Sequence, residues 1–355
     1  MNPFNPTFGD VPKILIDNDP KTTDIYKLVQ QSPFARSFFI TGVRGSGKTV
    51  LLSHLTKMFR QDPACYCIDL LNNDEILTSL AQQLYDQTHS PAAKFFDELG
   101  SISIGGFSVE RHFNKSSLAL TIDKMMAEIQ AKHHYVVITI DEVSNSESIR
   151  DFAQLFSALK RKQYPIYVIM TGLPELVLDI QNDDKLTFLL RSDKIVMTPL
   201  QKAEMISTYA QVFNCSTQLA SKLAQATAGY SYAFQLLGYL LFEHCQSKTP
   251  TIHDYQAVFP QYQLYLFDNA YQKIFASLSE MDRRYLIAIQ GNQKLQTVCE
   301  IMEKDKIYVS QYRRRAIERG LVLPSGRGFV KYTLPCFDQY VSEVQNPDSA
   351  YYLGY

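Results

Sequence analysis

The segment GVRGSGKT, from Gly42 to Thr49, constrains this chain more than any other feature of its sequence. It fits the pattern G-x-x-x-x-G-K-[ST] and lies between a short apolar run, SFFI, and the helical pattern TVLLSHLTKMF. This order of strand, loop and helix is the context that a phosphate-binding loop requires. Glycines are needed because backbone N–H groups must turn inward to cradle phosphate, which side chains would obstruct. The segment therefore predicts an α/β domain with a P-loop.

The residue types in this loop predict what it binds. We expect Lys48 to place its ammonium group between the β- and γ-phosphates, and the Thr49 hydroxyl to be a ligand of Mg²⁺. ATP and Mg²⁺ are therefore the expected cofactors. The residues expected to contact the nucleotide are Gly42, Val43, Arg44, Gly45, Ser46, Gly47, Lys48, Thr49 and Val50.

Two acidic residues follow the buried run YVVITI. Asp141 and Glu142 come directly after it, and ligands in open α/β sheets bind at the carboxyl ends of strands. An aspartate there can hold Mg²⁺, and an adjacent glutamate can polarise an attacking water. The alternative is an acidic turn in which one of the two residues caps a helix. The P-loop upstream favours Asp141 as a metal ligand and Glu142 as the catalytic residue that activates water.

Strand and helix patterns alternate over the first part of the chain. The runs SFFI, ACYCIDL, YVVITI and IYVIMT read as strands, and segments with apolar residues at helical spacing lie between them. This alternation predicts a parallel sheet with helices on both faces. Residues 90–118, where SISIGGFSVE alternates like a β-hairpin, are predicted to be an insertion. The nucleotide-binding core is expected to occupy residues 1–199.

Helical patterns replace the strands after Leu200. Four segments, near 200–213, 216–228, 231–246 and 251–260, predict a helical domain over residues 200–264. A third unit is expected over residues 265–345, followed by a tail over 346–355.

The third unit has the pattern of a winged helix-turn-helix. Helical segments at about 267–289, 294–303 and 307–319 precede two short strands in LVLPSGRGFVKYTLP. The unit is mildly basic, with 12 Lys and Arg against 9 Asp and Glu. Its third helix carries the polar and cationic side chains that a recognition helix needs in the major groove of double-stranded DNA. The predicted DNA contacts are Ser310, Gln311, Arg313, Arg314, Arg315 and, at the hairpin tip, Arg327. The alternative is a solvated basic helix in a domain that binds protein.

The P-loop and the ITIDEV run together resemble the AAA+ ATPases over residues 1 to about 260. The resemblance implies a P-loop NTPase core with a helical lid over 200–264. It also implies that Thr171, at the end of the next strand, senses the γ-phosphate, and that Arg191 acts as an arginine finger on the nucleotide of a second copy of the chain. The plainer interpretations are a turn hydroxyl for Thr171 and a solvated helix end for Arg191.

The sequence departs from the AAA+ pattern at two places. Asp17 and Asn18 stand where the family often carries a Gly-Arg pair near the adenine. The lid sequence GYSYAFQLL, from Gly229, has no arginine after the glycine. Loss of that cation predicts slow hydrolysis with nucleotide binding retained.

The order of AAA+ core, lid and winged helix is similar to the origin-recognition initiator ATPases of archaea and eukaryotes, and to bacterial ATPases that open with NPFxPxFG. This chain opens with NPFNPTFG. The resemblance implies an ATPase with low turnover whose nucleotide regulates DNA binding. Initiators also insert a DNA-contacting element where residues 90–118 lie, although the composition here is that of a hairpin instead of a helical element. The alternatives are a signalling NTPase of the STAND type, whose winged helix packs on protein, and an accessory ATPase of a mobile element.

Composition excludes several other classes. Positive and negative charges nearly cancel, giving a net charge of -1, so no overall field indicates a nucleic-acid or membrane partner, and any such partner must be sought in local patches. The longest near-continuous apolar run, Phe234 to Phe242, is too short for a membrane span. Six cysteines without a C-x-x-C pair predict no zinc site and no disulfide framework. The opening residues lack a signal peptide pattern, so we expect a cytoplasmic protein.

Overall fold

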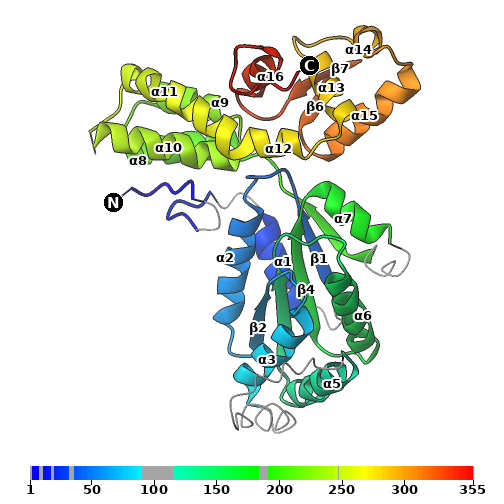
Figure 1. Cartoon of the computed structure of the whole chain (residues 1–355). Coiled ribbons are helices and arrows are strands. Elements are labelled where there is room, and N and C mark those ends of the chain that lie inside the picture. Colours follow the sequence, from blue (N-terminus) through cyan, green and yellow to red (C-terminus); the bar gives the residue numbers. More distant parts are fainter. Residues whose placement is uncertain are drawn as a thin grey trace, which may run out of the picture. The chain divides into compact units, whose positions relative to one another are not determined.

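The computed structural model describes residues 2–7, 11–16, 20–31, 36–89, 115–183, 191–246 and 248–354 (Figure 1). The chain divides into two compact units. The sheet unit comprises Asp19–Thr41 and Lys48–Val196, and the helical unit comprises Met1–Asn18, Gly42–Gly47 and Met197–Tyr355. None of the helices in the described ranges is long and apolar enough to cross a bilayer.

The sheet unit contains a five-stranded sheet with the order β2-β3-β4-β1-β5. All neighbouring strands are parallel, which confirms the predicted architecture. The strands are β1 Ser37–Thr41, β2 Cys65–Leu70, β3 Tyr135–Ile140, β4 Ile166–Gly172 and β5 Asp193–Val196.

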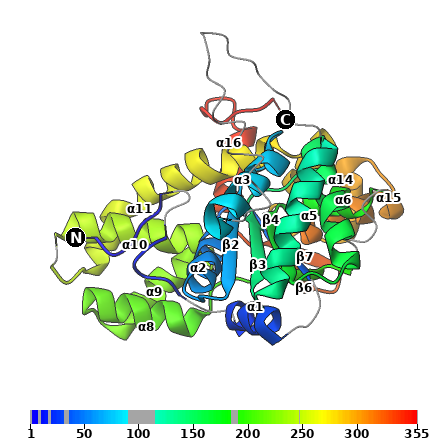
Figure 2. The same ribbon diagram turned by 90° about the horizontal axis from the view of Figure 1, so that it is seen from below.

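Helices cover both faces of this sheet, as the unalternating apolar strands require. Val136 and Ile138 join a core with α3, α5, α6 and α7, whereas Val137 between them lies outside that cluster. In Figure 2, α2 lies on the opposite side of the strands from α5 and α6. The helices are α1 Pro20–Gln31, α2 Lys48–Arg60, α3 Ile76–Thr88, α5 Lys115–Ala131, α6 Glu147–Arg161 and α7 Pro174–Gln181.

The helical unit contains four packed helices in the range where helical patterns follow residue 200, and the bounds of a separate lid, 200–264, stay a prediction. The four helices are α8 Lys202–Phe213, α9 Thr217–Thr227, α10 Ser231–Cys245 and α11 Ile252–Leu266. The N-terminal segment is anchored among them, because Phe4 is buried and its ring lies 5.6 to 5.7 Å from those of Tyr209, Phe213 and Phe234. Gly238 makes room for that ring, since a Cβ there would lie 2.5 Å from it.

The segment after residue 260 differs from the sequence prediction. Helix α11 continues to Leu266 and passes into a π-helical turn, η3 Phe267–Tyr271, and then into α12 Gln272–Ala276. The predicted helix over 267–289 is therefore not continuous. It is interrupted before Ser279, which caps the next helix by accepting from the Asp282 amide.

The remaining elements are those of a winged helix. They are α13 Glu280–Ala288, α14 Leu295–Met302, α15 Lys306–Glu318, the antiparallel pair β6 Val322–Gly326 and β7 Phe329–Tyr332, and α16 Phe337–Gln345. Three helices and a hairpin confirm the prediction. Gly320 follows α15 with φ +72°, a left-handed conformation suited to glycine at a helix end.

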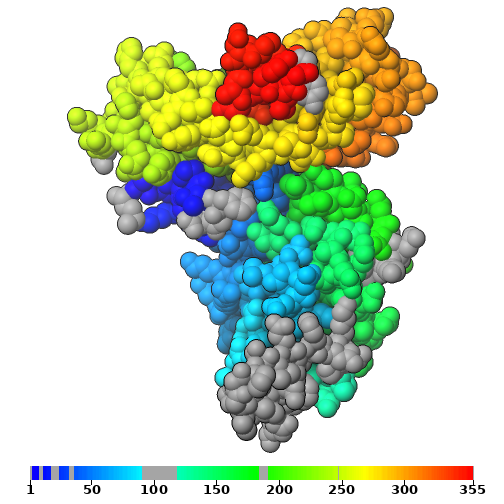
Figure 3. All heavy atoms as spheres, viewed as in Figure 1, coloured from blue at the N-terminus to red at the C-terminus, as the bar shows by residue number. Residues whose placement is uncertain are grey.

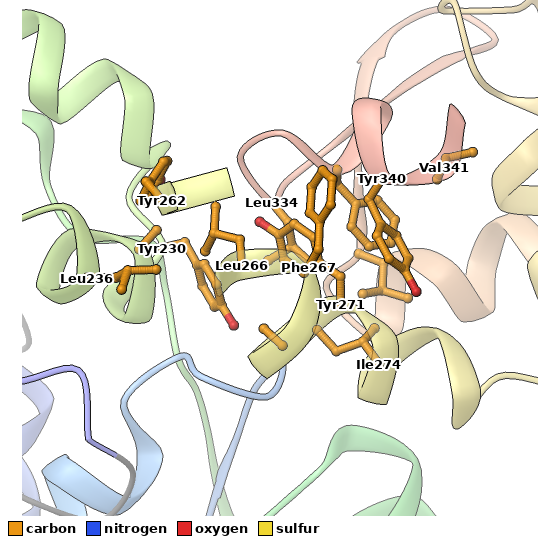
Figure 4. Close-up of a cluster of buried hydrophobic side chains, with 14 of the residues drawn as sticks. Tyr230, Leu236, Tyr262, Leu266, Phe267, Tyr271, Ile274, Leu334, Tyr340 and Val341 are labelled. Carbon is orange, nitrogen blue, oxygen red and sulfur yellow. The ribbon is translucent and has the colours of Figure 1, made fainter. Parts of the chain in front are cut away.

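The four packed helices and the winged helix share one hydrophobic core. Figure 4 shows its centre, where Phe267 and Tyr271 of η3 face Tyr340 of α16. The Phe267 ring lies 5.3 Å from that of Tyr340 and 5.6 Å from that of Tyr351. The Tyr351 hydroxyl also donates to Asp268 at 2.7 Å. In Figure 3 the red C-terminal segment accordingly lies against the yellow α11 and α12.

Two predicted features lie outside the described residues. They are the adenine-proximal pair, Asp17 and Asn18, and nearly all of the insertion predicted at 90–118. Helix α5 begins at Lys115, three residues before the helix that the apolar spacing predicts.

Candidate functional site

The P-loop, Gly42–Gly47, follows β1 and leads directly into α2. Gly45 and Gly47 have φ values of +76° and +94°, which residues with a Cβ rarely adopt. A Cβ at Gly45 would also overlap the Tyr230 hydroxyl. Gly45 is therefore required both by its backbone conformation and by the space around it, and Gly47 by its conformation.

The first turn of α2 connects the P-loop to the acidic strand end. Lys48 is largely buried. The Thr49 hydroxyl donates to Asp141 Oδ2 at 2.9 Å. The two residues predicted to ligate Mg²⁺ are thus in direct contact within the sheet unit.

Thr171 contacts the same carboxylate from the neighbouring strand. Its hydroxyl donates to Asp141 Oδ1, and it accepts from the Glu142 amide at 3.1 Å. This contact follows from the topology, because β3 and β4 are adjacent and both end at this edge of the sheet. The predicted residues Thr49, Asp141, Glu142 and Thr171 therefore form one hydrogen-bonded group.

Glu142 has a strained backbone and an exposed side chain. Its φ is +52°, an uncommon conformation for a residue other than glycine. Asn72, just after β2, donates to the Glu142 carbonyl oxygen at 3.0 Å and to Ser144 Oγ at 3.3 Å. Sequence reasoning missed Asn72. Asn72 could have been found because it follows β2, the strand beside β3, and ligands bind at the carboxyl ends of such strands.

The oxygen atoms at this edge of the sheet suit Mg²⁺. Thr49 and Asp141 supply a hydroxyl and a carboxylate, and Mg²⁺ in proteins is usually held by one or two carboxylates together with substrate phosphates and water. In the described part of the chain no three His, Cys, Asp or Glu side chains cluster as a metal site. The residues present therefore fit a metal held jointly with a nucleotide.

Arg191 lies just before β5 and is exposed. Its position agrees with the sequence prediction, because β5 is the edge strand that pairs with β1. The role of this residue toward a second copy of the chain stays a prediction.

The predicted DNA contacts of the winged helix differ in exposure. Ser310, Gln311 and Arg314 are exposed on α15, and Arg327 is exposed in the hairpin turn. Arg313 is half-buried.

Arg315 is engaged within the winged helix. Its guanidinium donates to the buried Asp282 at 2.7 Å, and Arg319 approaches the same oxygen at 3.3 Å. Part of the cationic charge on α15 is thus neutralised inside the domain.

Two family matches cover separate parts of the chain. Residues 35–178 match the AAA domain, and residues 268–341 match a domain of unknown function (DUF8462). A curated protein from Leuconostoc mesenteroides, named argininosuccinate lyase, is 26% identical over 203 residues. The match spans 49% of this chain and 44% of that protein.

Two solved structures share the fold over nearly the whole chain. The Walker-type ATPase PABY2304 of Pyrococcus abyssi has a TM-score of 0.65 at 12% identity, over 92% of this chain and 96% of that one. The ORC2 protein of Aeropyrum pernix, solved as ADPNP–ADP complexes, has a TM-score of 0.62 at 10% identity, over 96% and 95%. At these identities the likeness concerns the fold. Residues 35–178, which contain the P-loop, therefore carry an AAA domain, and the fold of the chain is similar to that of the Walker-type ATPase and of the ORC2 protein.

Proposed function

We propose that the chain binds ATP with Mg²⁺, hydrolyses it slowly, and uses the bound nucleotide to regulate attachment of its winged helix to double-stranded DNA. The observation that carries the nucleotide part is the hydrogen-bonded group of Thr49, Asp141 and Thr171 at the carboxyl edge of the sheet. Thr49 comes soon after the P-loop, whose Gly45 and Gly47 have the positive φ values that a phosphate-binding loop needs.

Each residue of this group has a distinct task in the proposed reaction. Lys48 binds the β- and γ-phosphates, while Thr49 and Asp141 would hold Mg²⁺, which neutralises charge that develops on phosphate oxygens. Glu142 accepts a proton from the attacking water. Thr171 fixes the orientation of the acid pair, because it is bonded to the Asp141 carboxylate and to the Glu142 amide.

Slow hydrolysis is expected because the lid of this chain provides no arginine to the nucleotide. The segment that opens α10, Tyr230–Tyr232, contains no arginine. We propose that Arg191 instead reaches the nucleotide of a second copy, because an arginine finger supplied in trans can stabilise the transferring phosphoryl group. Arg191→Ala should then lower the hydrolysis rate and abolish its dependence on protein concentration.

Two substitutions test the nucleotide site. Lys48→Ala should abolish binding of a fluorescent ATP analogue, since the phosphates lose their cation. Glu142→Gln should retain bound ATP without hydrolysing it. If Glu142→Gln turns over ATP as fast as the parent, its proposed role in activating water is wrong.

Exposed polar residues on α15 support the DNA part of the proposal. Ser310, Gln311 and Arg314 lie on its accessible surface, and Arg327 lies on the hairpin. These side chain types read base edges and phosphates in the major groove. Arg314→Ala should weaken binding and reduce its salt dependence by about one phosphate contact.

A protein-binding winged helix is the second candidate, and two observations favour it. Arg315 is already paired with Asp282, which lowers the charge available to phosphate. Ile307, in the first turn of α15, is 78% exposed. Filter binding of the purified chain to duplex DNA, with and without ATP, separates the two candidates. Retention that is equally weak for the parent and Arg314→Ala would favour a protein partner.

We further propose that the chain acts in the cytoplasm. All six cysteines are free, as expected for a protein of a reducing compartment.

A further inference from the structure

The residues that open helix α10 hold the P-loop by its carbonyl oxygens. The Tyr230 hydroxyl donates to the Arg44 carbonyl at 2.7 Å, and the Ser231 hydroxyl donates to the Ser46 carbonyl at 3.1 Å. These contacts lie within the helical unit, to which the P-loop belongs. They join the nucleotide-binding loop to the lid through main-chain atoms.

Peptide geometry gives these contacts a direction. In a trans peptide the carbonyl of one residue and the N–H of the next point opposite ways. Because the carbonyls of Arg44 and Ser46 point at the start of α10, the N–H groups of Gly45 and Gly47 point away from it. A loop that binds phosphate needs N–H groups presented on one side in this manner.

Tyr230 is suited to act as a permanent donor. It is buried, and burial raises the pKa of its hydroxyl above the ordinary tyrosine value, so the group stays protonated at physiological pH. Its oxygen also occupies the space that a side chain at Gly45 would need. The tyrosine thus restricts both the orientation of a loop peptide and the residue type beside it.

We propose that Tyr230 and Ser231 are positioning residues of the nucleotide site, a role that rests on the proposed binding of ATP. They hold the peptides of the P-loop so that each offers its oxygen to α10 and its N–H to a phosphate. A phosphate that accepts from the N–H polarises the peptide and strengthens the carbonyl as an acceptor. Nucleotide and α10 therefore stabilise each other's binding to the loop, and this coupling is reciprocal.

The contact continues from the loop toward the winged helix. The Tyr232 amide donates to the Gly45 carbonyl at 3.1 Å, and the Tyr232 hydroxyl accepts from Asn269 of η3 at 3.1 Å. Val43 contributes to the core of the helical unit, and a Cβ at Gly320 would lie 3.0 Å from it. Tyr232 thus links the loop to the turn that joins the lid to the winged helix, and Val43 of the loop lies beside Gly320, which follows α15.

Nucleotide titrations of matched variants test the proposal. Tyr230→Phe removes only the hydroxyl donor and keeps the buried ring, while Ser231→Ala removes the second donor. Tyr239→Phe is the control, because Tyr239 lies on the same helix and is exposed. We expect the dissociation constant of a fluorescent ADP analogue to rise about 5-fold in Tyr230→Phe, to rise also in Ser231→Ala, and to match the parent in the control.

Hydrogen exchange at the Tyr232 amide supplies a second measurement. ADP should slow this exchange in the parent, and slow it less in Tyr230→Phe, whereas a merely structural tyrosine would lower the melting temperature without changing either quantity. Unchanged ADP affinity in both Tyr230→Phe and Ser231→Ala would overturn the inference and leave the proposed function intact. A parent protein that binds no nucleotide would overturn both.

Discussion

Replacing Asp282 by asparagine should destabilise the helical unit measurably. The Asp282 carboxylate is buried and accepts from Ser279 at 2.6 Å in the first turn of α13. It also pairs with Arg315 of α15 and with Arg319, the residue that follows α15. Asp282→Asn keeps the shape of the side chain and removes its charge, so two guanidinium groups one helical turn apart lose the anion they share.

The burial of these ion pairs determines how much the free energy of unfolding falls. Removing one partner of a buried ion pair costs about 3 to 5 kcal/mol, because the other charge stays uncompensated. Here water reaches the partners, since the Arg315 side chain is 42% exposed and that of Arg319 is 15% exposed. With this screening, we expect the free energy of unfolding to fall by about 2 kcal/mol.

Urea denaturation followed by circular dichroism measures this loss. Asp348→Asn is the control, because it removes an acidic charge from an exposed position of the same unit. If Asp282→Asn loses no more stability than the control, the ion pairs do not hold α13 against α15. The same reasoning assigns Arg315 a structural task, so Arg315→Ala should lower stability while Arg314→Ala lowers DNA affinity.

Three further changes test other parts of the structure. Phe4→Ala should lower the free energy of unfolding by about 3 kcal/mol, because it leaves a cavity among aromatic rings; thermal unfolding of the parent and variant checks this. Asn72→Ala should lower the rate of ATP hydrolysis at unchanged ATP affinity, since it frees the Glu142 carbonyl; an unchanged steady-state rate would dismiss a positioning role. Hydrogen bonds from the residue that caps α11 hold the pKa of Asp254 below its usual value. The stability it contributes is present above the ordinary carboxyl pKa and is lost as pH falls, so urea titrations below about pH 4 should show a smaller decline in Asp254→Asn than in the parent.

The sequence predicted most of the nucleotide site because parallel topology fixes where strand ends meet. Thr49, Asp141 and Thr171 come together since β1, β3 and β4 end at one edge of the sheet. Asn72 lies at the same edge, where its side-chain amide donates to the Glu142 carbonyl and to the Ser144 hydroxyl. No motif marks such a residue, so only the sheet order locates it.

Several helices escaped prediction for a shared physical reason. Helices α1 and α7 begin at Pro20 and Pro174, and prolines in a sequence suggest a turn, although the first turn of a helix accepts proline because its N–H groups lack intrahelical partners. Helix α16 begins at Phe337, after Pro335 and the N-cap residue Cys336. The π-helical turn η3 escaped prediction for a different reason, because Phe267 and Tyr271 pack on residues far along the chain and local periodicity does not contain that information.

Contacts through backbone atoms and distant charges were also beyond sequence reasoning. The hydrogen bond from the Tyr230 hydroxyl to the Arg44 carbonyl involves a main-chain group that every residue carries, so the sequence does not mark it. The pairing of Arg315 with Asp282 joins positions 33 residues apart on different helices. The sequence shows that these residues can form hydrogen bonds and ion pairs, but it does not show which residues they contact.

The aromatic core around η3 decides how this protein can be cut into pieces for experiments. A fragment starting at residue 265 would keep only the last two residues of α11 and remove the side chains that cover Phe267 and Tyr271. Such a fragment would expose large apolar rings and is expected to aggregate during purification. A protein intended for DNA studies should therefore retain the N-terminal segment with Phe4, helices α8 to α11, and the final residues through Leu353, whose amide bonds to Val344.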